Sequence, residues 1–208
     1  GPDSHGEWWS ENRKIGFAHR RLAIIDLSSK GHQPMMDENN SIVITYNGEI
    51  YNFNHIKEDL RLIGYKFRSN SDTEVVLNAF KEWGSECFQK FNGMFAMAIY
   101  DLNTNKLYLA RDRAGEKPLF YSYKDGCIRF ASELKSLICD SSFEKKIDLK
   151  ALDCYFSMGY VPGEQCILQG YKKLPASSYL EFNLNNEKIV LEKYWNIPRP
   201  SEVNDDSV

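Results

Sequence analysis

The chain has 208 residues, of which 42% are hydrophobic and 13% aromatic, with a formal net charge of −3 and a pI near 5.9. This length suits one domain with room for the start of another, and the apolar content argues against wholesale disorder. The mild acidity argues weakly against nucleic acid as a partner. No apolar run approaches the length of a membrane span and no signal peptide opens the sequence, so we expect a soluble protein without a membrane partner.

Cysteine and histidine usage predicts no metal site in this segment. The cysteines form no C-x-x-C pair and are odd in number, so neither a zinc site nor a full disulfide framework is indicated. Most lie among apolar residues, as small core side chains do, which favours a cytoplasmic location. The histidines also lack metal-ligand spacing. The cysteines are Cys87, Cys127, Cys139, Cys154 and Cys166, and the histidines are His5, His19, His32 and His55.

Two strands and then a helix are expected in the first third of the chain. Residues 15–25 suggest a strand that enters a polar turn, and residues 31–40 are expected to be loop. The β-branched run 41–46 indicates a buried strand, and the segment 47–52 after it opens with Asn-Gly, a strong turn signal. Apolar residues then recur on one helical face over 53–62.

A second helix is expected to begin at Ser71. Its hydroxyl can cap the helix, and Glu74 lies three residues further on, which is the pattern of a capping box. Gly84 is placed to end this helix. A further short helix is expected over 87–91.

The second half of the chain is rich in short strands. Polar turns separate the first four, as in a meander of antiparallel hairpins, and a hairpin turn separates the last two. The predicted strands are 94–100, 106–111, 119–123, 128–131, 179–183 and 188–193, and the predicted helices are 133–138 and 149–158. Antiparallel strands with clustered helices indicate an α+β fold in which sheet packs on sheet and helices lie outside. We expect one domain over 1–195, followed by a linker over 196–208.

Three groups of polar residues stand at strand ends or helix starts. Arg21 interrupts an apolar run and is suited either to a carboxylate or to an exposed sheet edge. Asp72 lies in the first turn of a helix, where a carboxylate is stabilised by the dipole whether or not it binds an amine. Asn47 and Gly48 could present a side-chain amide and a backbone N–H to one point, as an oxyanion hole requires, or form an ordinary turn. Spacing alone does not show that these groups converge.

Six ordered motifs resemble the glutamine amidotransferase domain of glutamine-hydrolysing asparagine synthetases, a class II (Ntn-type) domain. The resemblance extends from Gly1 to Trp195. The motifs are Gly1-Pro-Asp3, His19-Arg-Arg-Leu-Ala-Ile-Ile-Asp26, Gly31-His-Gln-Pro-Met35, Asn47-Gly-Glu-Ile-Tyr-Asn52, Ser71-Asp72 and Arg111-Asp-Arg-Ala-Gly-Glu-Lys-Pro-Leu-Phe-Tyr121. It implies an Ntn-hydrolase-like four-layer α-β-β-α sandwich of two antiparallel sheets.

The resemblance also implies roles for individual residues. Arg21 would hold the α-carboxylate of glutamine and Asp72 its α-amine. The Asn47 side-chain amide and the Gly48 N–H would form the oxyanion hole. The residues expected to line the pocket are Glu49, Leu22 and Ile25.

The nucleophile of the resembled family is an N-terminal cysteine, and Gly1-Pro2-Asp3 matches a segment inside the domain. The sequence is therefore expected to lack the leading strand with its Cys-Gly, and to be inactive as a glutaminase. It also contains no Ser-Gly-Gly-x-Asp-Ser pyrophosphate loop. No cofactor is expected in this segment, and the resemblance assigns ATP and Mg to a synthetase domain that follows.

The favoured hypothesis is the ammonia-supplying domain of an ATP-dependent asparagine synthetase, with glutamine and the C-terminal synthetase domain as partners. A homodimer is an open alternative for the assembly. A second hypothesis is a non-hydrolytic Ntn-like binding or scaffold domain, as in β-lactam synthetases or amidotransferases of secondary pathways. A cysteine after the initiator Met of the full-length gene would support hydrolysis.

Overall fold

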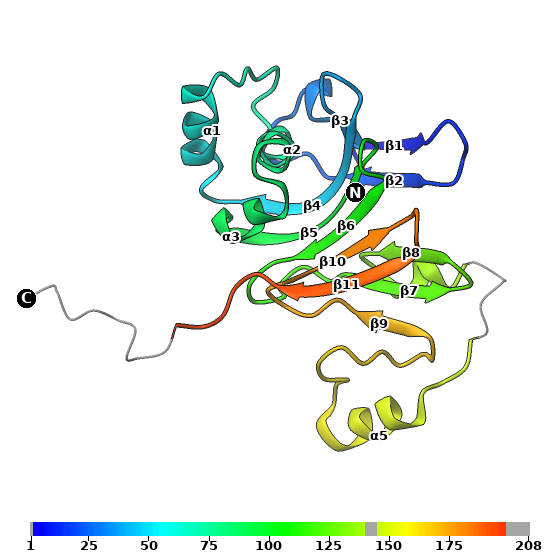
Figure 1. Cartoon of the computed structure of the whole chain (residues 1–208). Coiled ribbons are helices and arrows are strands. Elements are labelled where there is room, and N and C mark those ends of the chain that lie inside the picture. The colour runs from blue at the N-terminus through cyan, green and yellow to red at the C-terminus, as the bar shows by residue number, and fades with distance from the viewer. Residues whose placement is uncertain (1, 140–144, 199–208) are drawn as a thin grey trace, which may run out of the picture.

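The computed structural model describes residues 2–139 and 145–198. Its largest layer is an antiparallel sheet with the strand order β11-β10-β6-β5-β4-β3 (Figure 1). The strands are β3 (Met35–Met36), β4 (Ile42–Ile50), β5 (Gly93–Asp101), β6 (Lys106–Arg111), β10 (Ser178–Asn183) and β11 (Lys188–Lys193). Side chains alternate across the two central strands, so that Ile44 and Phe95 point to one face while Val43 and Ala96 point to the other.

Helices cover one face of this sheet and bury the larger apolar core. They are α1 (Phe53–Leu62), α2 (Asp72–Trp83) and α3 (Cys87–Lys90), with 3₁₀ turns at Ser29–Gly31 and Gly84–Glu86. Leu60 and Leu77 pack onto Ile44 and Phe95 beneath them. Within the described residues, no helix has the length and apolarity to cross a membrane.

The other face of the sheet packs on a second strand layer, which is divided into two sheets. One pairs β1 (Ser4–Trp9) with β2 (Gly16–Arg21), and the other has the order β8-β7-β9. The remaining elements are β7 (Phe120–Lys124), β8 (Cys127–Ala131), β9 (Tyr171–Lys173), α4 (Leu134–Leu137) and α5 (Leu149–Met158). The rings of Phe17 and Phe130 are in contact between the layers, with their centroids 5.5 Å apart. Helix α4 packs on the outer side of the three-stranded sheet through Leu137. The α+β sandwich predicted from the sequence is confirmed.

Several strand predictions need correction. The strand expected over 15–25 ends at Arg21, and its partner β1 was missed because its residues alternate between half-buried and exposed without a continuous apolar run. The expected meander is split, since β6 pairs with β10 while β7 pairs with β9. Local turn signals predict which two strands form a hairpin, but they do not predict which strand pairs with the outer edge of that hairpin. Of the expected linker 196–208, residues 199–208 lie outside the described residues.

The capping box predicted at the start of α2 is only half correct. Ser71 is the N-cap, and its hydroxyl accepts a hydrogen bond from Thr73 N at 3.2 Å. The Glu74 carboxylate does not accept a hydrogen bond from Ser71 N, which donates to Ser69 Oγ. The carboxylate accepts instead from Arg68 N at 2.9 Å and Ser69 N at 2.7 Å. Glu74 therefore fixes the chain entering the helix.

One buried carboxylate holds the connection between β6 and β7. Asp112 is fully buried and accepts four backbone N–H groups, those of Phe95 at 3.1 Å, Ala114 at 3.1 Å, Glu116 at 2.8 Å and Lys117 at 2.9 Å. These bonds tie the loop after β6 to the central strand β5.

We predict that Asp112→Asn lowers the free energy of unfolding by about 2–4 kcal/mol, because an amide NH₂ would face donors that need an acceptor. Chemical denaturation followed by circular dichroism measures the loss. Asp101→Asn is the matched control, since Asp101 accepts from Asn103 N and the Thr104 hydroxyl on an exposed turn. Equal losses for the two variants would contradict the prediction.

Candidate active site

Asn47 and Gly48 lie inside β4 and not in the turn that the sequence predicted. They pair with Ala96 and Phe95 of β5, and neither takes a positive φ. Glycine is required at 48 for another reason: a Cβ there would collide with the Met94 carbonyl oxygen and the Phe95 backbone. The Asn-Gly signal misled because glycine also marks a close approach of two backbones.

The register of β4 directs the Gly48 N–H away from β5. The backbone N–H groups of Tyr46 and Ile50, two residues to either side, both donate to side chains outside the sheet. Because N–H groups alternate in direction along a strand, the Gly48 N–H points the same way. Phe95, which lies opposite Gly48, donates its N–H to the Asp112 carboxylate and accepts from Asp112 N at its carbonyl oxygen. Among the described residues, none accepts a hydrogen bond from Gly48 N.

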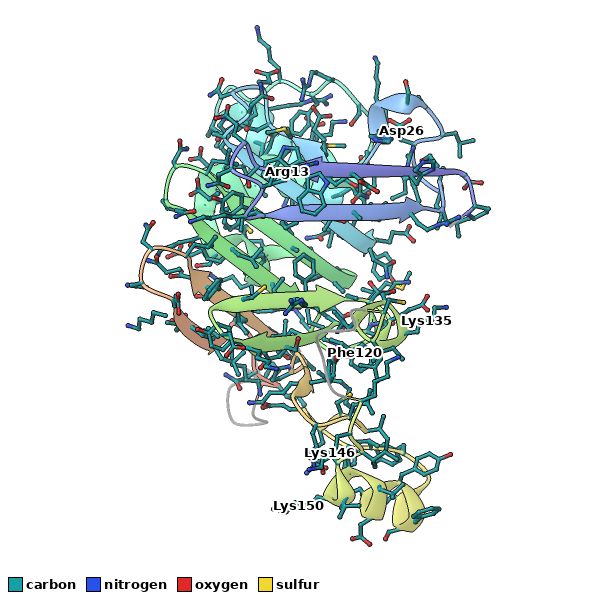
Figure 2. The ribbon with its side chains drawn as sticks, turned by 90° about the vertical axis from the view of Figure 1, so that its right-hand side faces the viewer. Arg13, Asp26, Phe120, Lys135, Lys146 and Lys150 are labelled. Carbon is teal, nitrogen blue, oxygen red and sulfur yellow. The ribbon has the colours of Figure 1, made fainter. Side chains whose placement is uncertain are left out.

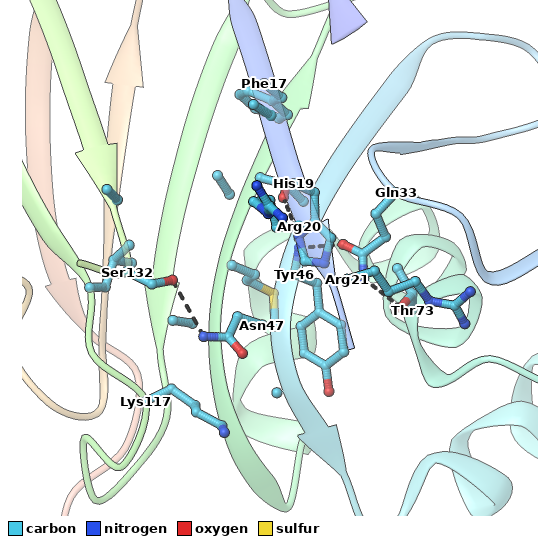
Figure 3. A pocket seen from close by; sticks show the side chains of 18 of the residues that line it. Phe17, His19, Arg20, Arg21, Gln33, Tyr46, Asn47, Thr73, Lys117 and Ser132 are labelled. Carbon is cyan, nitrogen blue, oxygen red and sulfur yellow. Dashed lines mark hydrogen bonds between the residues drawn. The ribbon is translucent and has the colours of Figure 1, made fainter. Parts of the chain in front are cut away.

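The side chain of Asn47 projects into a cleft between the two strand layers (Figure 3). Its Nδ2 donates to Ser132 Oγ at 3.4 Å, a long hydrogen bond across from the end of β8. Glu49 lines the same cleft from the same face of β4. Lys117 lines the cleft from the loop that Asp112 organises and lies below Asn47 in Figure 3.

Asp72 is a buried carboxyl at the start of α2. Its Oδ2 accepts from the Tyr46 hydroxyl at 2.7 Å and from Ile50 N at 3.1 Å. Burial raises the pKa of Asp72, while the hydrogen bonds from Tyr46 and Ile50 oppose that rise. The same burial, with the Asp72 charge, raises the pKa of Tyr46 and keeps it a hydrogen-bond donor. Asp72 is among the residues that line the cleft that Asn47 enters.

Arg21 ends β2 and faces the cleft beside His19. Both follow Phe17 at two-residue steps, so all three side chains leave the same face of the strand. The Arg21 guanidinium donates to the carbonyls of Asp26 and Ser28, at 3.0 Å for Ser28. It thus holds backbone carbonyls, a use that the sequence did not indicate.

The loop that follows β2 forms one rim of the cleft. Leu22 and Ile25 line the cleft, and Leu22 is 61% exposed. The loop is tied down by polar contacts, since Ala23 N donates to Asp3 at 2.8 Å and Asn70 N donates to Asp26 at 3.0 Å. These contacts explain why an apolar run expected as a strand is a loop instead.

The structure brings all seven residues named from the sequence to this one cleft, whose volume is about 1210 Å³. The residues are Arg21, Leu22, Ile25, Asn47, Gly48, Glu49 and Asp72. Sequence reasoning missed others that line it, namely His19, Gln33, Tyr46, Thr73, Lys117 and Ser132. The two-residue spacing of His19 from Arg21 could have indicated the first. Nothing in the local sequence indicated Ser132, which comes from a distant hairpin.

Cysteine does not contribute to the cleft walls. All five cysteines lie in the described part of the chain, and none of them is among the lining residues. The described residues also contain no group of three or more His, Cys, Asp or Glu side chains placed to hold a metal ion.

The chain belongs to the glutamine amidotransferase domain family, whose model matches residues 1–195. The resemblance read from the motifs is thereby confirmed at the level of this domain. The structure of the glutamine phosphoribosylpyrophosphate amidotransferase from B. subtilis has a similar fold, with a TM-score of 0.59 over 88% of this chain and 36% of that one, at 20% identity.

Two relatives named as asparagine synthetases match most of this chain. The putative asparagine synthetase [glutamine-hydrolyzing] 2 of Methanocaldococcus jannaschii is 37% identical over 95% of this chain and 41% of its own length. Asparagine synthetase [glutamine-hydrolyzing] 1 of Bacillus subtilis is 40% identical over 86% of this chain and 28% of its own length. The chain therefore spans less than half the length of these curated relatives.

The half-buried His19 gives the site a measurable pH dependence. Burial is the main cause that lowers the pKa of His19 to about 4, and its Nδ1 lies 3.1 Å from the Thr45 hydroxyl. An unfolded histidine takes up a proton near pH 6.5, so the free energy of unfolding should fall as the pH drops from there to about 4.

We predict that His19→Gln reduces this acid-dependent loss by on the order of 1–2 kcal/mol, because glutamine does not titrate and can still bond Thr45. Denaturation midpoints of both proteins at a series of pH values measure the difference. Parallel stability curves for the two proteins between pH 7 and 4 would contradict it.

Proposed function

We propose that this cleft binds glutamine and that the domain supplies ammonia within a longer asparagine synthetase. The observation that carries the proposal is the meeting of Arg21, Asp72 and the Asn47-Gly48 pair at one cleft. A cation, an anion and two hydrogen-bond donors match the α-carboxylate, α-ammonium and carboxamide of a zwitterionic amino-acid amide. The family membership and the names of the relatives support glutamine as that amide.

In this proposal a thiolate attacks the carboxamide carbon of glutamine. The carbonyl oxygen becomes an oxyanion, which the Asn47 Nδ2–H and the Gly48 N–H stabilise. The amide nitrogen takes up a proton as the C–N bond breaks, so that ammonia leaves and a thioester remains. Water then adds to the thioester carbonyl and displaces the sulfur, which gives glutamate and the free thiol. Ser132 would give up its long hydrogen bond to Asn47 when the oxyanion forms.

The thiolate itself has to come from outside the described cleft walls, because no cysteine lines them. The cleft offers a place for it. In the part of the chain that the structure describes, no strand pairs with the outer edge of β2 or of β8. Both strands line the cleft, and a strand added between them would join the two smaller sheets into one. A cysteine carried by such a strand would face Asn47.

The activity of the whole protein, its aspartate acceptor and its use of ATP and Mg belong to the same proposal and rest on the names of the relatives. The buried or unpaired state of the cysteines supports a cytoplasmic location. The competing function, a domain that binds glutamine without hydrolysing it, is favoured for this chain alone by the absence of a cysteine from the cleft.

We predict that the purified 208-residue chain binds glutamine but releases no glutamate. Calorimetry measures the binding and a coupled glutamate assay measures turnover. Steady glutamate release by this chain would contradict the proposal that the thiolate comes from outside the described cleft. If the folded chain does not bind glutamine, the proposed binding site is wrong. The full-length natural protein assayed beside it separates a hydrolytic domain from one that only binds.

We predict that Arg21→Lys and Asp72→Asn each weaken glutamine binding by about tenfold to a hundredfold. Lysine keeps the charge but loses the bidentate contact of a guanidinium with a carboxylate, and asparagine removes the anion that would pair with the ammonium. Arg61→Lys, on the outer surface of α1 beside Glu58, is the control and should bind normally. Affinity should also fall on acidification, and should do so at a higher pH than for an ordinary aspartate, because burial raises the pKa of Asp72 and its protonated form cannot pair with an ammonium. A pH-independent affinity in the wild type would exclude Asp72 as the amine ligand.

A further inference from the structure

Helix α5 stands apart from the rest of the fold. It is well formed at both ends, since Asp148 accepts from Lys150 N at 2.9 Å and Ala151 N at 3.0 Å, and Gly159 ends it in the left-handed conformation. Of its ten residues only Ala151 is buried. Figures 1 and 2 both show it at the lower end of the molecule, away from α1 and α2. A helix this short depends on packing for its stability, and the rest of the domain buries little of its surface.

Large apolar side chains gather around this helix. Leu149 and Phe156 are 73% and 77% exposed and lie two turns apart on the same side. We call the side of the helix that carries Leu149 and Phe156 the α5 face. Further exposed apolar residues surround it, namely Ile147, Tyr155, Met158 and Tyr160, of which Met158 lies half a turn away from Leu149. Beside it is a hollow of about 470 Å³ between the end of the helix and Ile167. A cluster of this kind marks an interaction surface.

The charges around the α5 face indicate a protein partner. Lys146 and Lys150 stand at the start of the helix (Figure 2), and the helix itself also carries Asp153. A lipid-binding helix would carry basic side chains along its polar face, which this mixture does not provide. A protein surface with its own apolar patch fits better.

We propose that the α5 face docks onto the synthetase part of a longer natural chain, C-terminal to residue 208. This rests on the proposed function and names the surface through which the two parts meet. The relatives extend well beyond the region matched here, which is 41% of one and 28% of another.

The test uses the full-length natural protein with Phe156→Lys or Leu149→Lys, and Leu62→Lys as the control. Leu62 is 86% exposed on α1, in the other half of the molecule. A charge in a buried apolar contact should lower the amount of amide product formed per glutamate released by about tenfold. Glutamate release and ammonia-driven synthesis should stay within about twofold, and the control should match the wild type. Two substitutions guard against a local folding defect.

Amide hydrogen exchange over 149–158 supplies a readout independent of activity. These amides should be protected in the full-length wild type and should exchange faster in both α5 variants. Unchanged coupling and unchanged exchange in the variants would overturn the proposal. A variant-dependent shift from dimer to monomer would assign the face to a second copy, and binding of the wild type to phosphatidylserine vesicles would assign it to a membrane, and either result also overturns it. If the wild type releases no glutamate, the proposed function fails while the exchange experiment still reports on docking.

Discussion

The carboxyl of Asp72 is the contact on which the geometry of the site depends. A buried carboxyl is stable only where donors reach it, and here the donors are the Tyr46 hydroxyl and the Ile50 N–H of β4. These two residues flank Gly48 on either side. The same contact therefore docks α2 on the sheet and fixes the strand segment that carries the outward N–H. Buried contacts between α2 and β4 therefore determine where the site residues of β4 lie, and the loops around the cleft form only its rim.

A second constraint fixes the other side of the same strand. Cβ atoms at Gly48 or Gly93 would collide with backbone of the opposite strand, so β4 and β5 approach more closely there than side chains allow. Beyond β5, the Asp112 carboxylate binds Phe95 N and the loop that carries Lys117. Strand β4 and the loop that carries Lys117 are therefore both held against β5. A shift of β5 would move these two walls of the cleft together.

Sequence reasoning reached the fold class and most elements because their signals are local. The ends of β11 and α5 match the predicted bounds, and Gly84 ends α2 as expected. The failures share a cause. Asn-Gly was read as a turn, although the partner strand across from Gly48 decides its conformation, and that partner lies nearly fifty residues away.

The candidate site divides in the same way. Arg21, Asp72 and the Asn47-Gly48 pair were named from motifs, while their convergence needed the fold. The partners they use could not be read from sequence at all: Arg21 holds the carbonyls of Asp26 and Ser28, and Asn47 meets Ser132. Side-chain chemistry restricts the kind of partner, but only tertiary packing selects which residue it is.

The charges in the cleft also bear on what it can distinguish. Burial lowers the pKa of His19, so Arg21 is the fixed cation on its face of β2, and the Asp72 carboxyl lines the same cleft from the start of α2. In the proposed binding mode, an amide without α-substituents would leave a guanidinium and a buried carboxylate without their ionic partners. Unpaired charges of this kind cost far more than the loss of a methylene contact. Discrimination would therefore come from the zwitterionic end of the ligand, and the donors of Asn47 and Gly48 would remain free to act on the oxygen that changes charge.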